Sequence, residues 1–177
     1  MKWGGVERGA VEPAMKEVRG GGRAGASVAE EREGSVADGR KLGAQAKKLG
    51  LFAAGAATQK YMQAIQEQQE VMGAIADMVI ETYAMESAVL RAQKIAQQKG
   101  EAAASFAIAM TRVYLSQAME KIEAAAKKII AAVAEGDMLR TQLAILRRLV
   151  KHEPFNTIAL RQQIAQKVIE RGKYTLA

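Results

Sequence analysis

Cysteine is absent from the 177 residues, histidine occurs once, proline occurs twice, and only 5% of the residues are aromatic. Without cysteine the chain can form neither a disulfide framework nor a thiolate metal site. The first ten residues, MKWGGVERGA, lack the apolar core of a secretion signal. No run of about 18 uncharged apolar residues occurs that could span a membrane. We therefore expect a soluble protein of the cytoplasm.

Catalytic motifs are missing as well. The sequence has no nucleophile–base pair and no metal-spaced cluster, and His152 has no companion ligand. The glycine-rich segment GGGRAG at 20–25 lacks a preceding strand, and GSVADGRK at 34–41 lacks the Lys-Ser/Thr order of a phosphate loop. The isolated chain is thus expected to have no catalytic residue, no bound cofactor and no metal site.

Apolar residues make up 49% of the chain, and alanine and methionine supply much of that fraction. Small side chains and long unbranched ones suit closely packed helices better than strands. Residues 1–37 instead hold eight glycines and balanced charge, which is typical of a segment that buries little. The sequence predicts a mobile, glycine-rich arm over residues 1–37. Over residues 38–177 it predicts an all-α, up-and-down bundle of four to five helices.

The first predicted helix starts from an N-cap at Asp38 and continues toward Gln66. At Gln66 the pattern permits either one long rod or a tight reversal. Interior glycines cost a helix about 1 kcal/mol each relative to alanine. We expect Gly43, Gly50 and Gly55 at places where another backbone comes close.

Caps and breaks bound the remaining helices. Gly100 is expected to end the second helix in a left-handed cap, and Asp137 and Asn156 are expected to cap the last two helices. The predicted ranges are 70–99, 101–135, 137–151 and 157–171.

The second of these helices is apolar over an unusually wide face. One apolar line follows Met72, Ile75, Val79, Tyr83 and Leu90, and a second follows Val71, Met78, Met85 and Val89. Only a narrow strip with Asp77 and Glu81 remains polar. Such width predicts that this helix is the central rod of the bundle, enclosed by several neighbours.

Glu86 interrupts the apolar line that contains Val79, so its carboxylate is expected to face packed surface and to need a partner. If the chain reverses near Gly100, positions 86 and 112 lie at the same height along two antiparallel helices. We predict a structural ion pair between Glu86 and Arg112.

The first half of the third long helix is apolar all round, because Phe106, Met110 and Val113 lie away from Ile108 and Leu115. A second helix of the same chain or a separate partner should cover Phe106, Met110 and Val113.

The net charge of +7 is unevenly distributed: residues 67–98 carry −3 and the chain after Gly136 carries +5. We expect a basic surface at Arg140, Arg147, Arg148 and Lys151. It could be merely solvated, or it could face an acidic protein, anionic lipid or nucleic acid.

Several blocks resemble a known family. ADMVIETYAMESAVLRAQK at 76–94 and EGDMLRTQLAILRRLVKHEPFNTIALRQQIAQKVIERGKY at 135–174 look like the C-terminal helical extension of bacterial very-long-chain-type acyl-CoA dehydrogenases. EEREG at 30–34 and KKLGLFAAGAA at 47–57 extend the resemblance, which covers about residues 10–177. Several blocks in the right order make the resemblance specific.

The resemblance implies an FAD-dependent dehydrogenase core of fatty acid β-oxidation, with a catalytic glutamate and a flavin-contacting EGTNEI-type motif. Neither occurs in this sequence, so the chain is expected to begin after that motif and to lack the enzyme. Its first residues, MKWGGVERGA, match the family poorly, which suggests a gene fragment, a split gene or a wrongly assigned start codon.

In that family the extension is a non-catalytic bundle that packs on the dehydrogenase core and, in mitochondrial members, helps association with the inner membrane. The resemblance therefore implies a dehydrogenase core, in the same gene or a separate chain, as the partner of Phe106, Met110 and Val113. It also implies a reversal of the chain near Gln66. Peripheral contact with the inner membrane and a homodimer are further options, and nucleic acid is not an expected partner. The alternative from the residues is a phasin-like amphipathic coat on a membrane or granule surface.

Overall fold

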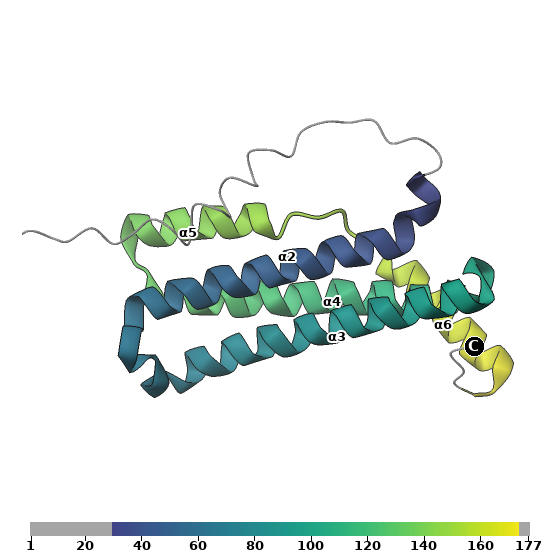
Figure 1. Cartoon of the computed structure of the whole chain (residues 1–177), viewed down its shortest axis with the longest axis horizontal. Coiled ribbons are helices and arrows are strands. Elements are labelled where there is room, and N and C mark those ends of the chain that lie inside the picture. The colour runs from purple at the N-terminus through teal and green to yellow at the C-terminus, as the bar shows by residue number, and fades with distance from the viewer. Residues whose placement is uncertain (1–29, 174–177) are drawn as a thin grey trace, which may run out of the picture.

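The computed structural model describes residues 30–173, and Figure 1 shows them as a bundle of long antiparallel helices. These residues form five α-helices and one 3₁₀ helix. The elements are α2 (Glu30–Tyr61), η1 (Met62–Glu67), α3 (Gln69–Lys99), α4 (Glu101–Val133), α5 (Gly136–Leu149) and α6 (Thr157–Arg171). The all-α prediction is confirmed for this part of the chain.

Local signals set the end of α3 and both ends of α6. Gly100 has φ 83°, a value that favours glycine, although its ψ of 161° is not that of the left-handed helical cap we expected. The Asn156 side chain accepts a hydrogen bond from the Ala159 amide, and Gly172 ends α6 in the left-handed conformation. These two residues therefore cap α6 as predicted.

Other boundaries differ from the sequence prediction. The first described helix begins at Glu30, so Asp38 lies within it and does not cap it. Residues 30–37 of the predicted N-terminal arm therefore lie in α2. Residues 1–29 of that arm lie outside the described residues. Helix α5 opens at Gly136, so Asp137 does not cap it but falls in its first turn, where it pairs with Arg140.

The chain reverses between α2 and α3, as the resemblance implied. Element η1 turns it, and the non-glycine residue Met62 takes φ 47° at the start of the turn. Tyr61 anchors the turn because its hydroxyl donates a hydrogen bond to the Ala132 carbonyl near the end of α4.

The central helix is α4, and the prediction that α3 is enclosed on most sides is wrong. Helix α4 contacts α2, α3, α5 and α6. Its buried residues include Leu115, Met119, Ile122, Ile129 and Ile130. Helix α3 buries the line that contains Met78 and Met85 and leaves the line that contains Val79 exposed. Only half of its wide apolar face therefore packs against other described helices.

Helices α2 and α3 approach closely at Gly39, where a methyl group added to the glycine would meet Val89 Cγ2 at 2.7 Å. At Gly43 the nearest atom would be Glu86 Cγ, at an ordinary 3.4 Å. At Gly50 and Gly55 no atom of another described segment lies within 4 Å of such a methyl. The expectation of close backbone approach is therefore wrong for those two glycines. No helix of the described residues is both long and apolar enough to cross a membrane.

Candidate functional site

Glu86 has a partner other than the predicted one. Its Oε1 lies 2.6 Å from Lys47 Nζ of α2, and both side chains are partly exposed. Positions 86 and 112 do lie at similar heights along α3 and α4, since the Thr111 hydroxyl donates to the Ala88 carbonyl across this helix pair. The error lies in direction: Glu86 faces α2, whereas Arg112 faces the segment between α5 and α6.

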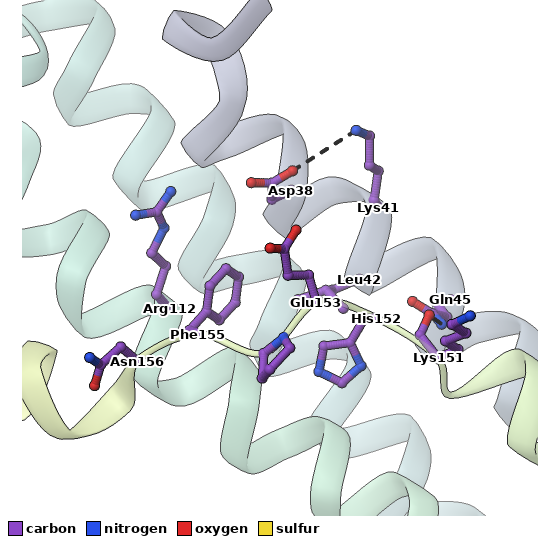
Figure 2. A pocket seen from close by; sticks show the side chains of 11 residues that line it. Asp38, Lys41, Leu42, Gln45, Arg112, Lys151, His152, Glu153, Phe155 and Asn156 are labelled. Carbon is purple, nitrogen blue, oxygen red and sulfur yellow. Dashed lines mark hydrogen bonds and ion pairs between the residues drawn. The ribbon is translucent and has the colours of Figure 1, made fainter. Parts of the chain in front are cut away.

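Arg112 lines a pocket in the described part of the chain, a half-open space of about 510 Å³. Figure 2 shows its guanidinium beside Phe155, and the distance to the ring centroid is 5.5 Å. Helix α2 contributes Asp38, Lys41, Leu42 and Gln45, and the remaining wall is formed by residues 151–156. The Gln45 amide holds that wall in place by donating to the carbonyls of Leu149 and Lys151.

The apolar face predicted to meet a partner is covered within the chain. Phe106 is only 6% exposed, and Met110 and Val113 are half-buried. Helix α6 packs against α4, and Lys167 of α6 places its Nζ 5.5 Å from the Phe106 ring centroid. Of the two alternatives left open, a helix of the same chain is the one observed, so Phe106 is not free to bind a separate partner.

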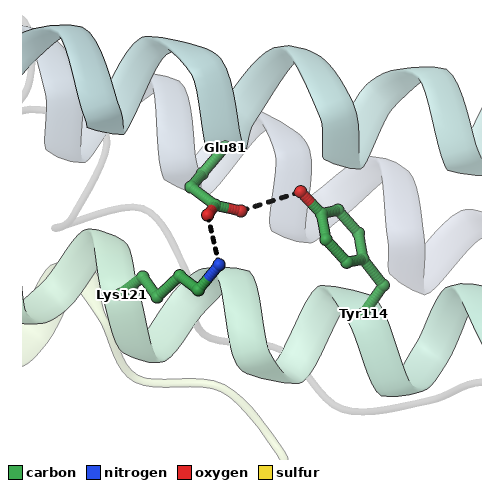
Figure 3. A network of polar contacts seen from close by, with 3 residues as sticks. All are labelled: Glu81, Tyr114 and Lys121. Carbon is green, nitrogen blue, oxygen red and sulfur yellow. Dashed lines mark hydrogen bonds and ion pairs between the residues drawn. The ribbon is translucent and has the colours of Figure 1, made fainter.

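A polar cluster that the sequence did not indicate joins α3 to α4 (Figure 3). Lys121 Nζ donates to Glu81 Oε1 at 2.5 Å, and the Tyr114 hydroxyl donates to Glu81 Oε2 at 2.7 Å. The hydrogen bond from Lys121 is the main cause that lowers the pKa of Glu81, despite partial burial. Burial, followed by the hydrogen bond to Glu81, raises the pKa of Tyr114 to about 12.

This cluster holds two helices together and takes no part in the lining of the Arg112 pocket. Sequence reasoning placed Glu81 on a solvent-facing strip. A usable signal was present, because Tyr114 and Lys121 lie two turns apart on one face of α4.

The predicted basic residues Arg140, Arg147, Arg148 and Lys151 are exposed on α5 and just after it. Arg140 pairs with Asp137 at 3.2 Å. Their role as a binding surface stays a prediction. The ring Nδ1 of His152 lies 2.8 Å from the Val150 carbonyl, and among the described residues no group of three His, Cys, Asp or Glu side chains could hold a metal.

Among the described residues, α3 exposes an apolar row, which we call the α3 stripe: Met72, Val79, Tyr83 and Leu90. Val79 is 61% exposed and Tyr83 is 74% exposed. The spacings of 7, 4 and 7 residues keep the row on one side of the helix. Ile80 is also exposed, and Leu51 of α2 is 75% exposed one turn beyond Lys47, which is paired with Glu86 of α3. The open side of the α2–α3 pair is therefore apolar.

Comparison with known proteins identifies the family. Residues 45–148 match the family described as acyl-CoA dehydrogenase, C-terminal domain. The chain belongs to this family. It is also 43% identical over 132 residues to a probable acyl-CoA dehydrogenase of Bacillus subtilis (strain 168). The aligned region covers 75% of this chain and 22% of that protein.

A crystal structure of an acyl-CoA dehydrogenase complexed with FAD from Bacillus anthracis matches with a TM-score of 0.81 and 38% identity. The match covers 93% of this chain and 27% of that one. The acyl-CoA dehydrogenase C-terminal domain described here thus spans about a quarter of the length of these relatives.

The Arg112 pocket of this acyl-CoA dehydrogenase C-terminal domain does not fit a flavin dinucleotide. The pocket has no glycine-rich turn leading into a helix that would take a pyrophosphate. No chemistry through FAD is derived for this chain.

The α3 stripe and the polar cluster of Glu81 lie wholly inside the residues that match the acyl-CoA dehydrogenase C-terminal domain. Of the pocket residues, only Gln45 and Arg112 do. The stripe therefore belongs to the part of the chain that defines the family, and most of the pocket does not.

Proposed function

We propose that this chain is a non-catalytic domain that docks on an FAD-dependent acyl-CoA dehydrogenase core of fatty acid β-oxidation and supports its assembly. The observation that carries the proposal is the α3 stripe, an apolar row with no partner among the described residues. The dehydrogenase core is encoded in the same gene or in a separate one.

The dimensions of the stripe suit a protein partner. From Met72 to Leu90 the helix rises about 27 Å at 1.5 Å per residue. Exposed apolar side chains in such a row mark interaction sites, and the one charged residue between Tyr83 and Leu90 on this side, Glu86, is already paired with Lys47. Tyrosine at the middle of such a row is a typical anchor of protein–protein interfaces, because its ring buries a large area and its hydroxyl remains wet.

The identity of the partner is supported by the relatives. The Bacillus subtilis protein is a probable acyl-CoA dehydrogenase and the Bacillus anthracis protein is an acyl-CoA dehydrogenase, and the part similar to this chain is 22% of the first and 27% of the second. The remaining sequence is the natural candidate to cover the stripe. The residues predicted for this contact, Phe106, Met110 and Val113, are replaced in the proposal by α3, since Phe106 is buried and Met110 and Val113 are half-buried.

The test mixes the purified chain with the Bacillus subtilis dehydrogenase truncated to remove the part similar to this chain. Binding is measured by sedimentation velocity and by titration calorimetry. We expect micromolar or tighter binding, and we expect Val79→Asp with Tyr83→Asp to abolish it, because two buried charges would lack partners. A folded chain that ignores the core at about 100 µM would contradict the proposal.

Matched controls separate docking from general stickiness. Ile158 and Ile169 of α6 are as exposed as the stripe residues, at 71% and 74%. Ile158→Asp with Ile169→Asp should leave core binding unchanged. Vesicles of anionic lipid provide the arm for the coat-protein alternative and for peripheral membrane contact. Binding to vesicles that depends on Tyr83, without binding to the core, would favour that alternative.

A further inference from the structure

We propose that the pocket between α2, Arg112 and residues 151–156 binds a small organic anion: a phosphate or carboxylate group carried on a compact apolar body. This inference does not rest on the docking role, because the pocket and the α3 stripe share no residue.

The first support is the state of Arg112. Its side chain is half-buried, its Nε is buried without a hydrogen-bond partner, and its guanidinium lies over the Phe155 ring. Among the described side chains no carboxylate pairs with it. A partly desolvated cation without a counterion is unfavourable, so the surroundings favour the arrival of a negative group. The planar fork of arginine matches carboxylate and phosphate oxygens.

The second support is the charge around the pocket. Lys41, Arg112 and Lys151 face Asp38 and Glu153, which leaves one net positive charge. Asp38 is already engaged, since Lys41 Nζ lies 3.9 Å from its Oδ1, as the dashed line in Figure 2 marks. The first turn of α6 follows directly after the pocket wall and adds the positive end of its helix dipole. The charges therefore suit one anionic group.

The third support is the size and the apolar part of the lining. Leu42, Pro154 and Phe155 line the pocket together with the charged groups. A volume of about 510 Å³ lies in the range of small-molecule sites and exceeds what a bare ion needs. The outer face of the Phe155 ring offers stacking surface for a flat ligand. The lining thus selects an anion with an apolar body.

The experiment titrates the ¹⁵N-labelled full chain at low salt and follows the amides of residues 151–157 and the arginine Nε–H signals by NMR. The probes are phenyl phosphate, benzoate, inorganic phosphate and the neutral benzyl alcohol. We expect saturable binding of phenyl phosphate or benzoate, and the tighter of the two identifies the anionic group. Inorganic phosphate and benzyl alcohol should each bind at least about tenfold more weakly, since each lacks one half of the recognised chemistry.

Variants locate the site. Arg112→Lys keeps the charge but loses the fork, and it should weaken binding about tenfold. Lys151→Gln changes an exposed side chain and leaves the core intact, and it should weaken binding by about threefold. The control Arg140→Gln removes an exposed charge outside the pocket and should leave affinity unchanged.

Circular dichroism verifies that each variant is folded. The proposal is overturned if no probe gives saturable shifts at residues 151–157. It is also overturned if Arg140→Gln weakens binding as much as Lys151→Gln does, because the attraction would then be a general effect of net charge.

Discussion

The contact between Gly39 and Val89 makes a quantitative prediction about helix packing. A methyl at position 39 would lie 2.7 Å from Val89 Cγ2 and 3.3 Å from Leu115 Cδ1. Both partners are buried, at 4% and 1% exposure, and Val89 is β-branched, so neither side chain can move away easily. Gly39→Ala therefore inserts volume into a packed interface.

Two opposing effects set the magnitude. Replacing glycine by alanine inside a helix stabilises it by about 1 kcal/mol. Overpacking of a core costs about 1–3 kcal/mol. We expect Gly39→Ala to change the free energy of unfolding from nearly zero to about 2 kcal/mol of destabilisation. At Gly55 no atom of another described segment lies within 4 Å of an added methyl, so only the gain in helix propensity applies. Gly55→Ala should therefore stabilise the fold by roughly 0.5–1 kcal/mol.

Urea unfolding followed by far-ultraviolet circular dichroism measures both variants on the full chain. Val89→Ala supplies a further check, because it removes Cγ2, the atom that an added methyl at position 39 would meet. In a double-mutant cycle, Gly39→Ala should cost less in the Val89→Ala background than in the native one. If Gly39→Ala is as stable as Gly55→Ala, or if the cycle shows no coupling, an added methyl at position 39 does not overpack the contact with Val89.

Three further predictions concern charged and titratable side chains. The pKa of Glu81 is lowered in the folded state, so the carboxylate contributes its stability above pH 4.5 and loses it as the pH falls through the folded-state pKa. The difference in unfolding free energy between wild type and Glu81→Gln should therefore shrink in acid. The pKa of Tyr114 is raised from 10.0 to about 12, so its contribution is complete below pH 10 and is lost as the pH rises toward 12; ultraviolet titration of tyrosinate, with Tyr114→Phe as control, measures this. In mutant cycles, Lys47 and Glu86 should couple by about 0.2–1 kcal/mol as a partly exposed pair, whereas coupling of similar size between Glu86 and Arg112 would contradict the observed pairing.

The sequence could predict features that depend on a few neighbouring residues. Asn156 and Gly172 cap α6 as predicted because a cap requires only its own side chain or a positive φ next to a helix end. The apolar width of α3 was also read correctly. The sequence analysis did not identify which half is buried, although Glu86 interrupts only the line that contains Val79. The choice depends on where α2 and α4 lie around α3.

The same limit explains the misassigned partner of Glu86. A turn at Gly100 fixes the height of a residue along two antiparallel helices, but it does not fix the direction in which the side chain points. The face with Phe106 is similar. The sequence indicated that another helix or a partner covers it, but the packing of α6 on α4 depends on how the chain turns at the break over 152–156. The pocket formed by that break joins residues far apart in sequence and had no local signal.

The hydrogen bonds of Gln45 have a consequence for the order of folding. Helices α2, α3 and α4 are consecutive antiparallel neighbours, so most of their contacts close short loops, which is typical of rapid folding. The bonds from Gln45 to the carbonyls of Leu149 and Lys151 instead bridge separations of 104 and 106 residues. Segment 149–156 should therefore join last and detach first, and native-state hydrogen exchange should find its amides less protected than those of α4. A ligand held by Arg112 and this segment would then fasten the part of the molecule that is easiest to open.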